Sequence, residues 1–185
     1  MRSTARVALA LVALASVSWA AADDAERQAE VARRGAAVMP FDLAATTHVF
    51  TKTARGGTQR VIAKRAGDAT QVRLVRTHLR EIQQEFERGD FSAPTRIHGA
   101  EMPGLAALQG APRGAIALAY RDVPGGAELT YTSADAKLVD ALHRWFDAQL
   151  ADHGHDAMAG HEAMPGHPRR ETGARRQEGA AAASR

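Results

Sequence analysis

Two stretches of the sequence repeat the same order of patterns, and this repeat limits what the chain can fold into. Residues 46–53 and 59–64 alternate as two strands joined at a Gly-Gly turn, and a helical pattern follows over 68–88. Residues 116–131 hold a second pair of alternating strands around a Gly-Gly turn, and another helical pattern follows over 135–151. An aspartate stands at the start of each helical pattern, where it can serve as an N-cap. The sequence therefore predicts two hairpin–helix units.

Two such units can bury one shared core if the hairpins form a single sheet. We expect an α+β fold with a four-stranded antiparallel sheet backed by two helices. The residues expected in the core are Phe50, Val75, Leu79, Ile82, Phe86, Leu118, Leu142 and Phe146. The likeness of the two halves indicates either a tandem ββα duplication or the shared propensities of these elements.

The remaining segments are expected to flank this domain of residues 39–151. Residues 23–38 are rich in alanine and charge, and predict a polar helical leader. Residues 90–113 contain three prolines and predict a loop with one short helix near 103–109. Residues 152–185 lack any hydrophobic period, so we expect a disordered tail, first rich in His and Met and then basic.

The first 22 residues have the order of a signal peptide. Arg2 and Arg6 precede an apolar run over 7–17, and small residues follow with cleavage sites after Ala20 or Ala22. The apolar run is shorter than the roughly 20 residues that span a bilayer. We expect a soluble mature protein in the periplasm or secreted, without stable membrane insertion. An uncut N-terminal anchor is the alternative.

Composition removes several classes of function. The chain has no cysteine, so thiolate catalysis and Cys-ligated metal sites are excluded. It has 24 Lys and Arg against 21 Asp and Glu, but two of the arginines lie in the predicted signal peptide and five in residues 168–185. Residues 23–167, which lie between these two segments, hold 17 Lys and Arg against 19 Asp and Glu, so they carry no basic excess and we expect no nucleic-acid partner. No protein partner can be named from the sequence.

The strongest functional signal lies at the start of the predicted tail. Four histidines and two methionines occur within residues 152–167. Imidazole binds copper, zinc and nickel, whereas the softer thioether favours Cu(I). We expect a metal site, with copper as the first candidate and zinc or nickel as alternatives. Its ligands would be His153, His155, Met158, His161, Met164 and His167.

The other four histidines lie inside the predicted domain, together with Met102. His98 and Met102 stand with Glu101 in a loop bounded by Gly and Pro, a place where functional residues often lie. They are added to the predicted metal ligands, although His98 could instead bond a backbone carbonyl and Met102 could fill the core. Whether His48, His78 and His143 converge with His98 cannot be judged from spacing.

Several sequence blocks have the character of a known family. They are Met39-Pro40-Phe41-Asp42-Leu43, residues 46–53, Arg88-Gly89-Asp90-Phe91, residues 97–105 and residues 145–154. The sequence resembles, over about residues 39–155, a family of small exported bacterial proteins that often carry the name aspartate carbamoyltransferase. That name implies an enzyme acting on carbamoyl phosphate.

The residues argue against that activity. A carbamoyltransferase of this kind needs a Ser-Thr-Arg-Thr loop, and the nearest match here is Ser3-Thr4-Ala5-Arg6 in the predicted signal peptide. Esterase, zinc-protease, phosphate-loop and dinucleotide motifs do not occur in the sequence either. The sequence predicts an exported metal-binding protein. The alternatives are a small periplasmic enzyme that uses domain histidines as acid–base groups or metal ligands, and a module that binds a partner through its sheet.

Overall fold

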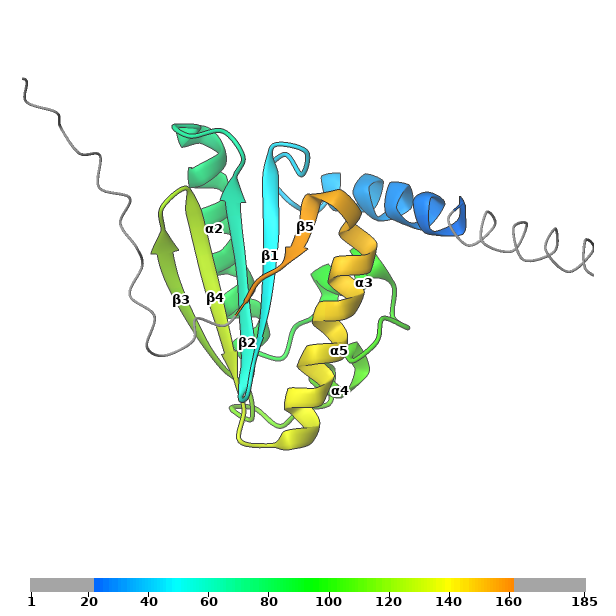
Figure 1. Cartoon of the computed structure of the whole chain (residues 1–185). Coiled ribbons are helices and arrows are strands. Elements are labelled where there is room, and N and C mark those ends of the chain that lie inside the picture. The colour runs from blue at the N-terminus through cyan, green and yellow to red at the C-terminus, as the bar shows by residue number, and fades with distance from the viewer. Residues whose placement is uncertain (1–21, 162–185) are drawn as a thin grey trace, which may run out of the picture.

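The computed structural model describes residues 22–161, which form one sheet with helices on its side (Figure 1). The strands are β1 (Thr46–Thr53), β2 (Gly56–Ala63), β3 (Ala117–Val123), β4 (Gly126–Thr132) and β5 (Ala157–Ala159). Their order is β3-β4-β2-β1-β5. All neighbours are antiparallel except β1 and β5, which are parallel. The predicted α+β class is confirmed, with five strands where the sequence predicts four.

The four strands of the two hairpins are arranged symmetrically about the β4–β2 pair, and β5 extends one edge of the sheet. β2 and β4 are the second strands of the two hairpins, and they pair with each other in the middle of the sheet. Each hairpin is followed by a long helix, α2 (Ala69–Glu87) or α5 (Ala136–His153). The two halves thus have the same order of elements, and whether a tandem ββα duplication or shared propensities produced it stays open.

The two long helices begin where the sequence predicts. The side chain of Asp68 accepts a hydrogen bond from the backbone N–H of Gln71, and that of Asp135 accepts one from Lys137. These bonds satisfy N–H groups that the first turn of a helix cannot pair internally. Both helices pack on one face of the sheet, because the ring of Tyr131 on β4 contacts both Phe86 of α2 and Phe146 of α5.

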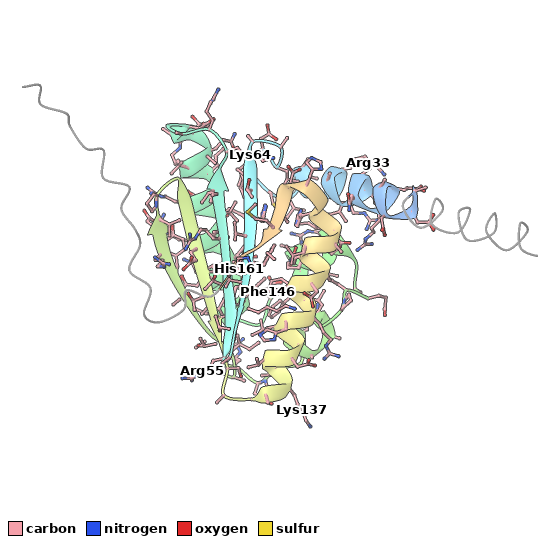
Figure 2. All side chains as sticks on the ribbon, viewed as in Figure 1. Arg33, Arg55, Lys64, Lys137, Phe146 and His161 are labelled. Atoms are coloured by element: carbon pink, nitrogen blue, oxygen red, sulfur yellow. The ribbon has the colours of Figure 1, made fainter. Side chains whose placement is uncertain are left out.

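The core lies between this sheet face and the helices. Figure 2 shows Phe146 enclosed there, while Arg33, Arg55, Lys64 and Lys137 lie around the outside. All the core residues predicted from the sequence are buried except Leu118, which is half-buried.

Two short helices cross the segment that the sequence predicts as mostly loop. They are α3 (Ser92–His98) and α4 (Leu105–Gln109). The second was expected and the first was not. Pro94 is in the first turn of α3, where a missing N–H costs no internal hydrogen bond, so the proline does not oppose this helix.

The folded region begins earlier and ends later than the sequence predicts. Residues 22–36 form a helix whose Val31 is completely buried, so this helix is packed on the domain. At the other end, α5 continues to His153 and is followed by the turn η1 (Gly154–Asp156) and by β5. A strand of three residues is too short to produce an alternating pattern. None of the described helices has the length and hydropathy that crossing a membrane requires.

Candidate functional site

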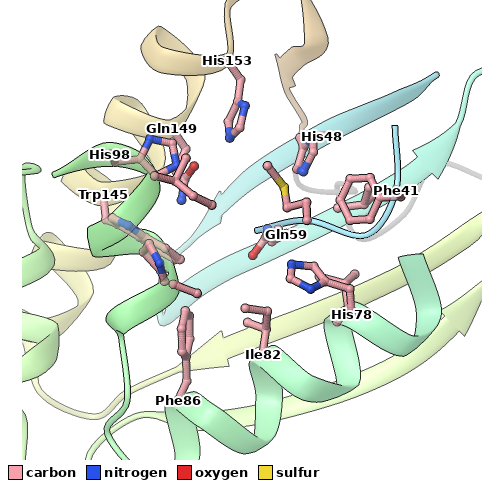
Figure 3. Close-up of a pocket in the computed structure, with 16 residues that line it drawn as sticks. Phe41, His48, Gln59, His78, Ile82, Phe86, His98, Trp145, Gln149 and His153 are labelled. Atoms are coloured by element: carbon pink, nitrogen blue, oxygen red, sulfur yellow. The ribbon is translucent and has the colours of Figure 1, made fainter. Parts of the chain in front are cut away.

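Four histidines from distant parts of the chain surround one small cavity (Figure 3). His48 comes from β1, His78 from α2, His98 from the end of α3 and His153 from the end of α5. The space open to the centres of water molecules is about 40 Å³. Other residues that line it include Met39, Phe41, Gln59, Trp145 and Gln149.

The secondary structure explains why these side chains meet. His48 lies between Thr46 and Phe50 on β1, and all three point to the covered face of the sheet because alternate strand residues share a face. His153 is the last residue of α5, and the pairing of β5 with β1 brings Ala157 opposite His48. Figure 3 shows His78 entering from α2 on the opposite side from His153.

The rings touch one another at the cavity. The imidazoles of His48 and His153 are stacked, with centroids 4.8 Å apart and planes within 5°. His98 meets His153 edge-on, with centroids 5.2 Å apart. Phe41 contacts His48 and His78, so an apolar ring closes this side of the group.

Burial keeps three of these histidines neutral. Loss of solvent lowers the pKa of His78 to about 4 and, together with repulsion from His98, lowers that of His153 to about 4. Burial also lowers the pKa of His48 well below its ordinary value, and the neighbouring histidines add to this. At neutral pH these rings are therefore uncharged donors and acceptors.

His98 differs from the others because it has an acidic partner. Its Nδ1 lies 2.7 Å from Oδ2 of Asp152. The guanidinium of Arg27, on the N-terminal helix, donates to both oxygens of that carboxylate at 2.7–2.8 Å and also to the backbone oxygen of His98. Burial acts to raise the pKa of Asp152, but the hydrogen bonds from His98 and Arg27 outweigh it and hold that pKa at about 2. Asp152 is therefore ionised, and His98, which lines the cavity, uses only its Nδ1 for this contact.

Two buried ring nitrogens of residues that line the cavity have no partner among the described residues. Nδ1 of His48 and Nε1 of Trp145 are fully buried without a hydrogen bond. The buried side chain of Gln149 lines the cavity beside these two nitrogens. Such groups cost roughly 1–3 kcal/mol each unless water or a ligand satisfies them. This cavity is therefore equipped to bind a polar molecule.

The histidines are close together but are not arranged as metal ligands. Within residues 22–161, no three His, Asp or Glu side chains form a group that could hold a metal ion. The lone pair of an imidazole lies in the plane of its ring, so the parallel rings of His48 and His153 cannot direct their nitrogens at one ion. The arrangement suits proton transfer better than metal coordination.

The residues predicted as metal ligands are distributed over several environments. His98 and His153 meet at the cavity, whereas Met102 is buried in the hydrophobic core. His155, Met158 and His161 are exposed near the end of the described chain. Met164 and His167 lie outside the described residues.

Two residues of the site escape sequence reasoning. Arg27 lies in residues 23–38, which the sequence predicts as a polar helical leader, and Asp152 lies in the predicted tail. The two are 125 residues apart, so nothing local in the sequence indicates that they pair. His143, in contrast, lies away from the cavity and its Nε2 contacts the backbone oxygens of Thr53 and Gly56 at the first hairpin turn.

Comparison of the chain with protein-family models, with curated proteins and with solved structures finds no match.

Proposed function

We propose that the protein is a small acid–base enzyme in which His98 moves a proton to or from a molecule bound in the cavity. The observation that supports this most is the 2.7 Å contact between Nδ1 of His98 and Oδ2 of Asp152 at the cavity wall. A carboxylate in this position selects the tautomer in which Nδ1 carries the proton and Nε2 carries the lone pair.

The pair has the properties that a general base requires. When Nε2 accepts a proton, the imidazolium that forms is stabilised by a carboxylate that is already ionised, since the pKa of Asp152 is about 2. Arg27 holds this carboxylate in place through two hydrogen bonds. The neutral ring of His153 lies against His98 and can hydrogen-bond a substrate or a water molecule. Imidazoles in this arrangement serve proton abstraction and the activation of water.

Solvent deuterium exchange into acetone tests this proposal, because a general base in a small cavity should remove a methyl proton from so small a ketone. The full chain in heavy water should incorporate deuterium faster than buffer, as followed by proton NMR. Replacing His98 by Asn should remove the excess rate. The matched control is His155→Asn, which removes an exposed histidine and should keep the excess rate of deuterium incorporation. Equal rates for the wild-type protein and His98→Asn would contradict the proposal.

A second candidate function is binding of copper by the C-terminal residues, with zinc or nickel as alternatives. His155 exposes 88% of its side chain, and Met158 is an exposed large apolar residue at 54%. Both are free to reach an ion together with His161, and the sequence adds Met164 and His167 beyond the described region. Mixed imidazole and thioether ligands suit copper in either oxidation state.

Metal titration of two variants tests this second candidate. Replacing Met158 and Met164 by Leu should weaken Cu(I) binding and leave Cu(II) binding largely unchanged, because imidazole suffices for Cu(II). Replacing His155, His161 and His167 by Asn should abolish Cu(II) binding at this segment. A chain that ends at residue 161 keeps β5 with His155, Met158 and His161 and lacks Met164 and His167. Its copper binding therefore shows how much the residues after 161 contribute. Full copper binding by the triple His variant would contradict this function.

We also propose that the protein works outside the cytoplasm, in the periplasm or secreted, on the basis of the signal-peptide pattern in its first 22 residues. The mass of the exported protein should lack residues 1–20 or 1–22. An exported protein that retains these residues would contradict this localisation.

A further inference from the structure

We propose that the cavity binds a small, uncharged molecule that both donates and accepts hydrogen bonds, such as a primary amide of a few non-hydrogen atoms. The inference rests on the cavity of the proposed enzyme and names the class of molecule that it accepts. It is based on three independent properties of the cavity: its size, the unpaired polar atoms around it, and the absence of an unpaired charge among the described residues that line it.

The size limits the ligand to a few atoms. A water molecule needs about 10–15 Å³ of space measured at its centre, so about 40 Å³ holds roughly three. Apolar side chains, among them Phe41, Ile82 and Phe86, form much of the wall. A ligand of this size with a short apolar end and a polar end fills the space and contacts both kinds of wall.

The polar atoms of the wall require both an acceptor and a donor on the ligand. Trp145 and Gln149 are four residues apart and thus on one face of α5. Nε1 of Trp145 can only donate, so it needs an oxygen. Nδ1 of His48 is the second unpaired atom, and the buried Gln149 amide, which also lines the cavity, can both donate and accept. The side-chain oxygen of Gln59 already accepts from the hydroxyl of Tyr131, which leaves its NH₂ group to donate.

The electrostatics favour a ligand without charge. His48 and His78 are neutral at physiological pH because burial lowers the pKa of each. The carboxylate of Asp152 is already paired with Arg27 and His98. A buried ion without a counter-charge is strongly disfavoured, so an anion or a cation of the same size should be rejected.

Fluorescence of Trp145 reports binding directly. The chain has two tryptophans, so the variant Trp19→Phe leaves Trp145 as the single reporter. The probes are acetamide, acetate and methylammonium, which are similar in size and differ in charge. We expect a saturable change with acetamide, and at least about tenfold weaker binding of the two ions, which corresponds to about 1.4 kcal/mol.

Two variants locate the effect. Gln149→Leu should weaken acetamide binding about tenfold, whereas Gln83→Leu, on the exposed side of α2, should not change it. If Gln149→Leu does not fold, a nuclear Overhauser effect between the acetamide methyl group and the Trp145 indole decides in the Trp19→Phe protein. An absent response to acetamide, or equal binding of acetate, would overturn the inference. Selective acetamide binding without deuterium exchange into acetone would support this inference and contradict the proposed enzyme function.

Discussion

Nδ1 of His98 lies 2.7 Å from Oδ2 of Asp152, although 54 residues separate the two in the sequence. The contact depends on three elements that meet at the same place: α3 ends at His98, α5 contains Asp152 near its end, and the N-terminal helix brings Arg27 to both. His48 and His78 complete the surroundings from β1 and α2. The proposed site is thus formed only when the sheet and these helices are assembled.

The ion pair between Arg27 and Asp152 provides the first prediction. Replacing Arg27 by Met removes two charged hydrogen bonds from the carboxylate, so the pKa of Asp152 should rise from about 2. Carboxyl carbon NMR over a pH titration measures this shift. The control Arg34→Met breaks an exposed pair with Glu30 on the same helix and should leave the pKa of Asp152 unchanged. A pKa unaltered by Arg27→Met would show that the pair is not formed in solution.

The buried histidines predict that the protein is less stable in mild acid. The pKa of His78 and that of His153 are about 4 in the folded protein and about 6.5 when unfolded. Only the unfolded chain takes up these protons between pH 6.5 and 4, so the free energy of unfolding is fully retained above pH 6.5 and falls as the pH drops towards 4. By pH 5 the loss should be about 2 kcal/mol for each such histidine.

Urea unfolding at pH 7 and pH 5 measures this loss. The variant His78→Leu should lose about 2 kcal/mol less than the wild-type protein between the two pH values. His155→Leu is the control, because the ring of His155 is exposed in the folded protein and its removal should not alter the difference. A wild-type protein that is equally stable at both pH values would contradict the burial of neutral histidines.

Gly104 provides a prediction about how the site is supported. It begins α4 with a φ of 82°, and a Cβ there would lie 2.1 Å from the backbone oxygen of Ala141 on α5. Gly104→Ala should therefore lower the free energy of unfolding by at least about 3 kcal/mol, from backbone strain and the clash together. Gly89→Ala is the matched control, since Gly89 has a φ of 79° with open space around it and should cost only about 1–2 kcal/mol. Equal losses would mean that α4 and α5 are not in close contact.

The long elements could be predicted from the sequence because their signals are local. Val75, Leu79, Ile82 and Phe86 recur at helical spacing, and Asp68 stands where the helix begins. The Gly-Gly pairs were expected in the turns, but Gly56 and Gly57 lie at the start of β2, and Gly126 begins β4. These positions put strand backbones close together: a Cβ on Gly126 would lie 1.9 Å from the oxygen of Val61. Only the pairing of the strands reveals that requirement.

The site could be predicted only in part. His98 and His153 stand out in the sequence for their neighbours, but as metal ligands in two separate segments. What makes His98 a candidate base is Asp152, and nothing local marks Asp152 as the partner of a residue 54 positions earlier. Arg27 lies still further away, in a helix whose composition suggests exposure. Side-chain pairing across the fold depends on tertiary packing, and a single sequence does not contain that information in its periodicity.

The protonation of the two ring nitrogens of His98 tests the central claim most directly. Nitrogen NMR of the full chain labelled at its histidines distinguishes a protonated from an unprotonated ring nitrogen. At pH 8 we predict that Nδ1 of His98 carries the proton, because Asp152 accepts it, and that Nε2 is unprotonated. Asp152→Asn should change this balance, whereas Asp156→Asn, next to the exposed His155, should not. A proton on Nε2 in the wild-type protein, or a His98 signal unchanged by Asp152→Asn, would contradict the proposed role of His98 as a base.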